Sequence, residues 1–130
     1  MTSEIYMLLI ATIVGYMLGA LPLADRISRR RGVNIFSSGT GLAGSSNVLK
    51  TVGKIPAAIV ALGDMAKGIL AVLIAQVFGI DGPVLVIPVA AAVIGHWHSV
   101  FTRFRGGDAL VTFGGSTIAM FTGYGVAAVA

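Results

Sequence analysis

Residues 5–24 read IYMLLIATIVGYMLGALPLA, a run that contains no Asp, Glu, Lys or Arg. A helix of about 20 apolar residues is long enough to cross the hydrocarbon core of a bilayer, which is about 30 Å thick. A secretory signal peptide is the competing interpretation. However, the preceding residues MTSE carry no basic side chain, the apolar run is too long, and basic residues follow the run. The stretch therefore predicts a first membrane-spanning helix.

The composition of the whole chain also indicates a membrane protein. Of its 130 residues, 56% are hydrophobic and 11% are charged, which is too few charges to cover the surface of a water-soluble domain of this size. The net charge of +4 favours membrane topology or an anionic ligand over nucleic acid. The chain has no cysteine, which excludes disulfides and thiolate metal sites.

Three further apolar runs follow the first. The second covers residues 57–78 and is interrupted only by one Asp and one Lys, the third covers residues 84–101, and the fourth covers residues 109–130. The connectors between these runs are short, and no change in composition marks a domain boundary. We predict an all-α, polytopic transmembrane bundle of about four spans, with residues 1–130 forming a single membrane domain.

Basic residues are concentrated on one side of the predicted bundle. The connector 25–56 holds six Lys or Arg residues, the loop 102–108 holds two, and the loops on the opposite side hold none. Because Lys and Arg are enriched in cytoplasmic loops, we expect the N-terminus outside and both polar loops in the cytoplasm. For Arg26 and residues 29–31, we favour an interpretation as anchors to anionic lipid headgroups.

Three ionisable residues lie inside the predicted spans. At 1.5 Å per residue, Asp64 lies roughly 10 Å from the cytoplasmic end of the second span and His96 roughly 8 Å from that of the third. Lys67 follows Asp64 by three residues and therefore shares its helix face. Ionisable residues inside a membrane face the bundle interior or a water-filled cavity and usually serve a function. The alternatives are a structural ion pair and a hydrogen-bonded structural histidine.

The connector contains a glycine- and serine-rich loop, SSGTGLAGSSNVLK, at residues 37–50. Residues 39–44 match G-x-G-x-x-G, but a dinucleotide site also needs a preceding strand and a βαβ unit, which two flanking spans do not provide. Successive backbone N–H groups in a glycine turn at a helix N-terminus form a concavity for an anion. The alternative is a simple helix cap by Ser45 or Ser46. The predicted phosphate-binding residues of this loop are Gly39, Thr40, Gly41, Gly44, Ser45, Ser46, Asn47 and Lys50.

The loop before the fourth run repeats this pattern. Arg105, Gly106 and Gly107 precede Asp108 and a helix start, and paired glycines beside a cation suit a phosphate. Since both loops lie on the same predicted face, we expect two anion sites to face one cytoplasmic pocket.

Other chemistries are less well supported. Ser45 or Ser46 with His96 and Asp64 would make an acyl-enzyme triad, but the chain has no G-x-S-x-G elbow. His96 and His98 are two residues apart on a helix, so they point to different faces and make a poor metal pair. The H-x4-D arrangement of acyl-CoA-dependent glycerolipid acyltransferases is absent after His96.

Three blocks of sequence occur in a fixed order: GTGLAGSSNVLK at 39–50, DMAKG at 64–68 and GHWHSVFTRFRGGDALVT at 95–112. In these blocks the chain resembles the bacterial acyl-phosphate:glycerol-3-phosphate acyltransferases of the PlsY type, over nearly its whole length. Members are seven-helix inner-membrane enzymes, so the resemblance implies that residues 1–130 are the N-terminal part of a longer domain. It also implies transfer of an acyl group from acyl phosphate to glycerol 3-phosphate, giving lysophosphatidic acid and phosphate, without cofactor or metal.

The resemblance assigns roles to individual residues. His96, Lys67 and Asp64 would be catalytic, with His96 contacting a substrate hydroxyl or phosphate and Asp64 orienting Lys67. The phosphate-binding set would be completed by Arg105, Gly106, Gly107 and Thr112. The chain departs from the family pattern at Leu42 for Asn, Lys50 for Arg, Ser99 for Pro, Arg105 for Lys, and Asp108-Ala109 for the Lys-Gly of a GGKG loop. A carboxylate at position 108 would repel a phosphate dianion.

Two functions from different classes fit these residues. The first is an acyl-phosphate-dependent acyltransferase of phospholipid synthesis in the bacterial inner membrane, with its active site facing the cytoplasm. The second is a noncatalytic paralogue or a small-anion carrier that uses the same polar pocket for binding alone.

Overall fold

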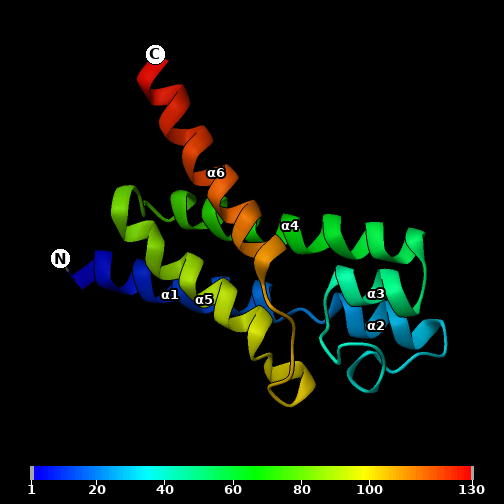
Figure 1. Cartoon of the computed structure of the whole chain (residues 1–130). Coiled ribbons are helices and arrows are strands. Elements are labelled where there is room, and N and C mark those ends of the chain that lie inside the picture. The colour runs from blue at the N-terminus through cyan, green and yellow to red at the C-terminus, as the bar shows by residue number, and fades with distance from the viewer. Residues whose placement is uncertain (1, 130) are drawn as a thin grey trace.

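The computed structural model describes residues 2–129, with the side chains of residues 2–122, and this part of the chain is helical without strands (Figure 1). The helices are α1 (Thr2–Ala20), α2 (Leu23–Arg30), α3 (Ser45–Thr51), α4 (Lys54–Val77), α5 (Val86–Trp97) and α6 (Leu110–Val129). Short 3₁₀ turns are η1 (Ile35–Ser37), η2 (Gly82–Leu85) and η3 (Val100–Thr102). The prediction of an all-α fold is confirmed.

Among the residues that the structure describes, three stretches are long and apolar enough to cross a membrane: Thr2–Arg30, Lys54–Val77 and Gly82–Thr102. They contain the first and third predicted spans and nearly all of the second. The fourth predicted run is α6, whose apolar part with described side chains is Leu110–Thr122. The last residue of the predicted run, Ala130, lies outside the described residues.

The first predicted span is not one continuous helix, which corrects the prediction for residues 5–24. The helix α1 ends at Ala20, and α2 begins at Leu23. Pro22 lacks the N–H needed to continue the helical ladder, and its ring disfavours a helical conformation at the preceding Leu21. The helix α1 therefore ends at this point, and the short α2 follows it after a non-helical link (Figure 1).

Close helix pairs build the bundle. The helices α1 and α5 lie side by side, and α6 packs on α4 (Figure 1). A Cβ at Gly19 would overlap the backbone of Ala92 on α5, and one at Gly68 would overlap that of Thr112 on α6. Small residues at such positions let helices approach closely, which is how membrane helices gain contact.

Apolar side chains cover the outside of the bundle as well as its interior. On α1, Ile5, Leu9 and Ile13 are 52%, 53% and 62% exposed, which suits contact with lipid and not with water. Inside, two buried clusters lie near the two ends of α4: Ala11, Val72, Ala75, Ile80, Leu85 and Val89 form one, and Ala24, Ile35, Ala43, Val48, Ala57 and Val60 form the other.

The polar loops share one end of the molecule. Figure 1 shows the N-terminus and the connector between α4 and α5 at one end, with α2, α3 and the loop 98–109 toward the other. We call the second end, comprising residues 21–53 and 98–109, the basic end. The predicted segregation of basic loops is therefore seen in the fold.

Candidate functional site

A buried ion pair on α4 is the centre of the site. Lys67 Nζ lies 2.8 Å from Asp64 Oδ1, and the two side chains are only 4% and 3% exposed. Lys67 Nζ also donates to the carbonyl of Gly19 on α1 at 3.3 Å. A buried charge without its partner is strongly destabilising, so each member of this pair requires the other. The prediction that Asp64 and Lys67 share one helix face is confirmed.

His96 brings α5 to the same point. Its Nδ1 lies 3.8 Å from Asp64 Oδ1 and 3.4 Å from Lys67 Nζ. Thr112 of α6 is fully buried, and its Oγ1 lies 3.5 Å from the same ring nitrogen. Four helices therefore contribute to one polar cluster, which we call the His96 cluster. The similar depths predicted for Asp64 and His96 correspond to this contact.

The loop 98–109 passes directly over the imidazole. A Cβ built on Gly107 would lie 2.7 Å from His96 Nε2 and 2.7 Å from the carbonyl oxygen of Ala43, so a larger residue does not fit. The N–H of Gly107 donates to the carbonyl of His96 at 3.2 Å, and the N–H of Ala43 donates to the carbonyl of Gly106 at 3.1 Å. These bonds join the two glycine loops to each other and to α5.

The loop 37–47 is organised by Asn47, which is 2% exposed. Its side-chain Nδ2 lies 3.2, 2.9 and 3.0 Å from the carbonyl oxygens of Ile35, Ser38 and Leu42, and its two hydrogens are shared among these three acceptors. Its Oδ1 accepts the N–H of Thr40 at 3.2 Å. Asn47 thus holds the loop in shape, and its own donors are engaged with the chain's carbonyls.

The first two glycines of this loop serve its turn. Gly39 and Gly41 have φ angles of 54° and 74°, which glycine adopts without a steric cost. Neither residue lines the cavity beside this loop, whereas Thr40 and Gly44 do. Gly39 and Gly41 therefore shape the backbone of the loop and do not themselves line the cavity.

That cavity, of about 210 Å³, lies between the two loops and the start of α6. We call it the glycine-loop cavity. Its lining consists of Thr40, Leu42, Gly44, Ser45, Ser46, Asn47, Asp64, His96, Asp108, Leu110 and Val111. Two carboxylates line it, and none of its described lining residues is Lys or Arg, which differs from the cationic pocket expected for phosphate. Leu110 and Val111 are lining residues that the sequence pattern did not single out.

The cations border a different space. A second, water-sized cavity of about 20 Å³ is lined by Lys67, Arg105 and Gly106, together with the end of α1 and with Ser99. His96 borders both cavities. The single pocket with two anion sites that the sequence predicts is therefore two spaces separated by the His96 cluster.

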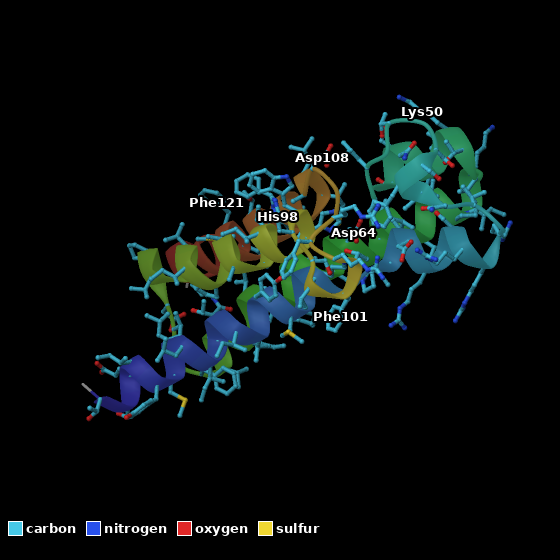
Figure 2. All side chains as sticks on the ribbon, turned by 90° about the horizontal axis from the view of Figure 1, so that it is seen from below. Lys50, Asp64, His98, Phe101, Asp108 and Phe121 are labelled. Atoms are coloured by element: carbon cyan, nitrogen blue, oxygen red, sulfur yellow. The ribbon has the colours of Figure 1, made fainter. Side chains whose placement is uncertain are left out.

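Lys50 lies outside the two cavities described above, and its predicted role in phosphate binding stays a prediction. The residue is exposed on the last turn of α3 and lines neither of these two cavities. Figure 2 shows it at the outer edge of its lobe, away from Asp64. An ammonium group without a buried anionic partner keeps its hydration, so the long side chain extends into solvent.

Ser99, noted in the sequence only as a departure from the family pattern, has a structural role. It is 4% exposed, and its hydroxyl donates to the carbonyl of Ala20 at 2.5 Å and accepts the N–H of Phe101 at 3.2 Å. The residue thus ties the end of α1 to the start of the loop 98–109. Because Ala20 is 79 residues away in the sequence, local pattern gives no signal for the contact with α1.

Comparison with known proteins identifies the family. A sequence model described as glycerol-3-phosphate acyltransferase matches residues 9–130. The glycerol-3-phosphate acyltransferase of Rubrobacter xylanophilus is 42% identical over 108 residues, covering 83% of this chain and 54% of that protein. The enzyme of the same name from one strain of Thermus thermophilus is 40% identical over 118 residues, covering 91% of this chain and 57% of that protein.

Solved structures agree with the sequence comparison. The crystal structure of PlsY, an integral membrane glycerol 3-phosphate acyltransferase, in its glycerol 3-phosphate form has a TM-score of 0.82 at 33% identity, over 92% of this chain and 60% of that one. The lysophosphatidic acid form has a TM-score of 0.78 at 33% identity, over 92% and 59%. The chain spans about half the length of the curated relatives it matches. The sequence from residue 9 onward and the arrangement of the helices agree in this respect. The chain belongs to the glycerol-3-phosphate acyltransferase family.

Proposed function

We propose that this chain carries the basic-end active site of a membrane acyltransferase that moves an acyl group from acyl phosphate to glycerol 3-phosphate. The observation that carries the proposal is the His96 cluster, buried among four helices and bordered by both glycine loops. The solved relative is described in a glycerol 3-phosphate form and a lysophosphatidic acid form, which supports the acceptor and the product. The acyl phosphate donor, without cofactor or metal, rests on the family resemblance.

The reaction needs little covalent chemistry from the protein. The hydroxyl oxygen of glycerol 3-phosphate attacks the acyl carbon, the bond between that carbon and the phosphate oxygen breaks, and inorganic phosphate leaves. His96 takes up the hydroxyl proton through Nε2, the ring nitrogen that faces Gly107. Lys67, held by Asp64, neutralises negative charge that develops on the departing phosphate. The products are lysophosphatidic acid and phosphate.

The protein also contributes by orienting the two substrates. Hydroxyls of Thr40, Ser45 and Ser46 line the glycine-loop cavity beside His96, where they would orient the glycerol part of the acceptor. Lys67 and Gly106 line the water-sized cavity and would receive a phosphate once that cavity widens around it. In this arrangement, each substrate would occupy one of the two spaces that His96 borders.

Reconstitution tests the proposal. The full-length protein in proteoliposomes, given acyl phosphate and glycerol 3-phosphate, is expected to form lysophosphatidic acid. Lys67→Ala and His96→Ala should each lower the rate by about 100-fold or more, the usual range for a lost acid–base or charge-stabilising group. Arg30→Ala, which removes an exposed base outside both cavities of the site, is the matched control and should leave the rate within about twofold.

A noncatalytic relative that only binds anions is the second candidate, and the carboxylate of Asp108 in the glycine-loop cavity favours it. Isothermal titration with glycerol 3-phosphate separates the two. Binding without any product at saturating acyl phosphate supports the second candidate and removes the first.

Topology is proposed as well, with the basic end in the cytoplasm of a bacterial inner membrane and the N-terminus outside. Residues 1–130 contain no cysteine, so a cysteine introduced among them is a unique label within this stretch. In intact cells stripped of their outer membrane, a membrane-impermeant maleimide should label Asp81→Cys at once and Ser38→Cys only after lysis. The reverse labelling pattern would contradict the orientation.

A further inference from the structure

A polar pocket lies on the far side of the His96 cluster from the glycine-loop cavity. It has a volume of about 290 Å³, and its lining includes Asp25, Arg29, Phe36, Phe101, Arg103 and Arg105. We call it the arginine pocket. Figure 2 shows Phe101, from this pocket, and Asp108, from the glycine-loop cavity, on opposite sides of Asp64. The pocket is therefore separate from the proposed acceptor site.

Two of its guanidinium groups are held in place by the protein. Arg29 contacts Asp25 Oδ1 through Nε at 2.8 Å, which leaves its terminal amino groups for a ligand. The guanidinium of Arg105 lies over the ring of Phe36, with Cζ 4.9 Å from the ring centroid. Side chains that are already restrained lose less entropy when a ligand binds.

The third guanidinium comes from a turn with an unusual backbone. Arg103 and Phe104 have φ angles of 55° and 62°, the left-handed region that non-glycine residues rarely adopt. The turn is held by the N–H of Phe104, which donates to the carbonyl of Ser99 at 2.7 Å, and by the Thr102 hydroxyl, which donates to the carbonyl of Arg105. Such a conformation persists only where the surroundings enforce it, and here it fixes where the Arg103 backbone lies in the pocket wall.

The charges of the pocket favour a phosphate. Three arginines and one aspartate line the pocket, and the carboxylate of that aspartate is already paired with Arg29. The remaining positive charge matches an anionic group, and the planar fork of arginine pairs with phosphate oxygens in a bidentate manner.

An apolar pocket adjoins the polar one. It has a volume of about 160 Å³, is lined by Leu21, Pro22, Leu23, Arg26 and Phe101, and shares Phe101 with the arginine pocket. Leu21 and Phe101 are 42% and 48% exposed, at the point where the spanning helix α1 ends. An apolar surface beside a cationic one, at the end of a membrane span, matches a molecule with a phosphate head and a hydrocarbon chain.

We propose that these two adjoining pockets bind one anionic phospholipid of the surrounding bilayer. Its phosphate lies among Arg29, Arg103 and Arg105, and the first part of an acyl chain lies against Leu21 and Phe101. The lipid is a bound neighbour of the enzyme and not its substrate, so this site exists whether or not the proposed transfer reaction takes place.

Native mass spectrometry of the full-length protein in detergent tests the site, with phosphatidylglycerol as the probe. The expected result is one preferentially bound lipid, with about tenfold weaker binding in Arg103→Gln and in Arg29→Gln, the loss typical of one charge-assisted contact. Arg30→Gln, on the same helix as Arg29 but outside the pocket, is the matched control and should bind as the wild type does. Circular dichroism verifies that each variant is folded.

Three further measurements distinguish a lipid site from a free-anion site and from diffuse surface attraction. Phosphatidylcholine, which has no net charge, should bind at least tenfold more weakly than phosphatidylglycerol. Inorganic phosphate and short-chain dihexanoyl phosphatidylglycerol at equal concentration should not displace the long-chain lipid. Displacement by inorganic phosphate would show a free-anion site, and equal losses in Arg30→Gln and Arg103→Gln would show diffuse attraction; either result overturns the proposal.

Discussion

The two glycine loops at the basic end are built in opposite ways. The loop 37–47 uses glycine where the backbone has positive φ, at Gly39 and Gly41, and one buried residue, Asn47, bonds three of its backbone groups and the carbonyl of Ile35 just before it. The loop 98–109 instead holds three non-glycine residues, Arg103, Phe104 and Ala109, at φ angles of 55° to 62°. The first loop is held by its own residues, because glycine stands where φ is positive and Asn47 bonds the backbone. The second loop is held by contacts with α1, α5 and the first loop.

This difference has a functional meaning. The loop 37–47 matches the family pattern in its glycines and in Asn47. The loop 98–109, which holds the three non-glycine residues with positive φ, carries Asp108-Ala109 in place of Lys-Gly. Substitutions in the first loop should therefore act mainly on stability. Those in the second loop should act on catalysis where they touch the site, and on stability where they change a residue with a strained φ angle.

The largest effect is expected for Asn47→Ala. The change leaves two carbonyls and one N–H of the first loop, and the carbonyl of Ile35 before it, without their partner, which should cost about 3 kcal/mol of unfolding free energy or more. Thermal unfolding in detergent measures it. Asn34→Ala, which removes one exposed cap on η1, is the control and should cost about 0.5–1 kcal/mol. Equal costs for the two changes would contradict the central role of Asn47.

Gly107→Ala tests the approach of the second loop to His96. The added methyl group meets His96 Nε2 and the Ala43 carbonyl, so we expect the rate of lysophosphatidic acid formation to fall about 100-fold, as a displaced catalytic group commonly does. Gly114→Ala, on α6, meets nothing within 4 Å and serves as the matched control. An unchanged rate in Gly107→Ala would show that the imidazole does not act from this position.

Asp108→Lys replaces a carboxylate of the glycine-loop cavity by the cation of the family pattern. Removing repulsion and adding attraction should strengthen phosphate-substrate binding about tenfold, seen as a lower KM for glycerol 3-phosphate or acyl phosphate in steady-state kinetics. Asp81→Lys, in the connector at the other end, makes the same charge change away from the site and should leave KM unaltered. An equal fall of KM in both variants would show that the effect comes from the overall charge of the protein.

The smallest effect is expected for Ala109→Gly. Ala109 has a φ of 62°, and glycine adopts that angle without the alanine penalty, so stability should rise by about 1 kcal/mol. Ala119→Gly makes the same exchange inside the helix α6, where glycine is unfavourable, and should lower stability by up to about 1 kcal/mol. The difference in melting temperature between the two variants measures the strain in the second loop, and a loss of stability in Ala109→Gly would show that no such strain exists.

Much of the fold follows from sequence because membrane spans are set by hydrophobic length. The apolar runs, the shared face of Asp64 and Lys67, and the common depth of Asp64 and His96 need only helix geometry. The bend after Ala20 was missed because apolar content alone does not distinguish a continuous span from one broken at Pro22.

The arrangement of the site was less predictable. Spacing along one helix does not tell which loop side chains turn inward, so Lys50 was expected at the site and lies outside it. The division of the polar space into a carboxylate-lined part and a cation-lined part depends on contacts between residues far apart in sequence, such as Ala43 with Gly106. The roles of the site residues stay predictions.

The ion pair of Asp64 and Lys67 has a consequence for an energised membrane. A transmembrane voltage acts on net charge, at about 2.3 kcal/mol for one elementary charge moved through 100 mV. The aspartate and the ammonium lie 2.8 Å apart and cancel, so the electric field exerts almost no net force on α4 at this depth. The geometry around His96 should therefore be the same in a respiring cell and in a de-energised one.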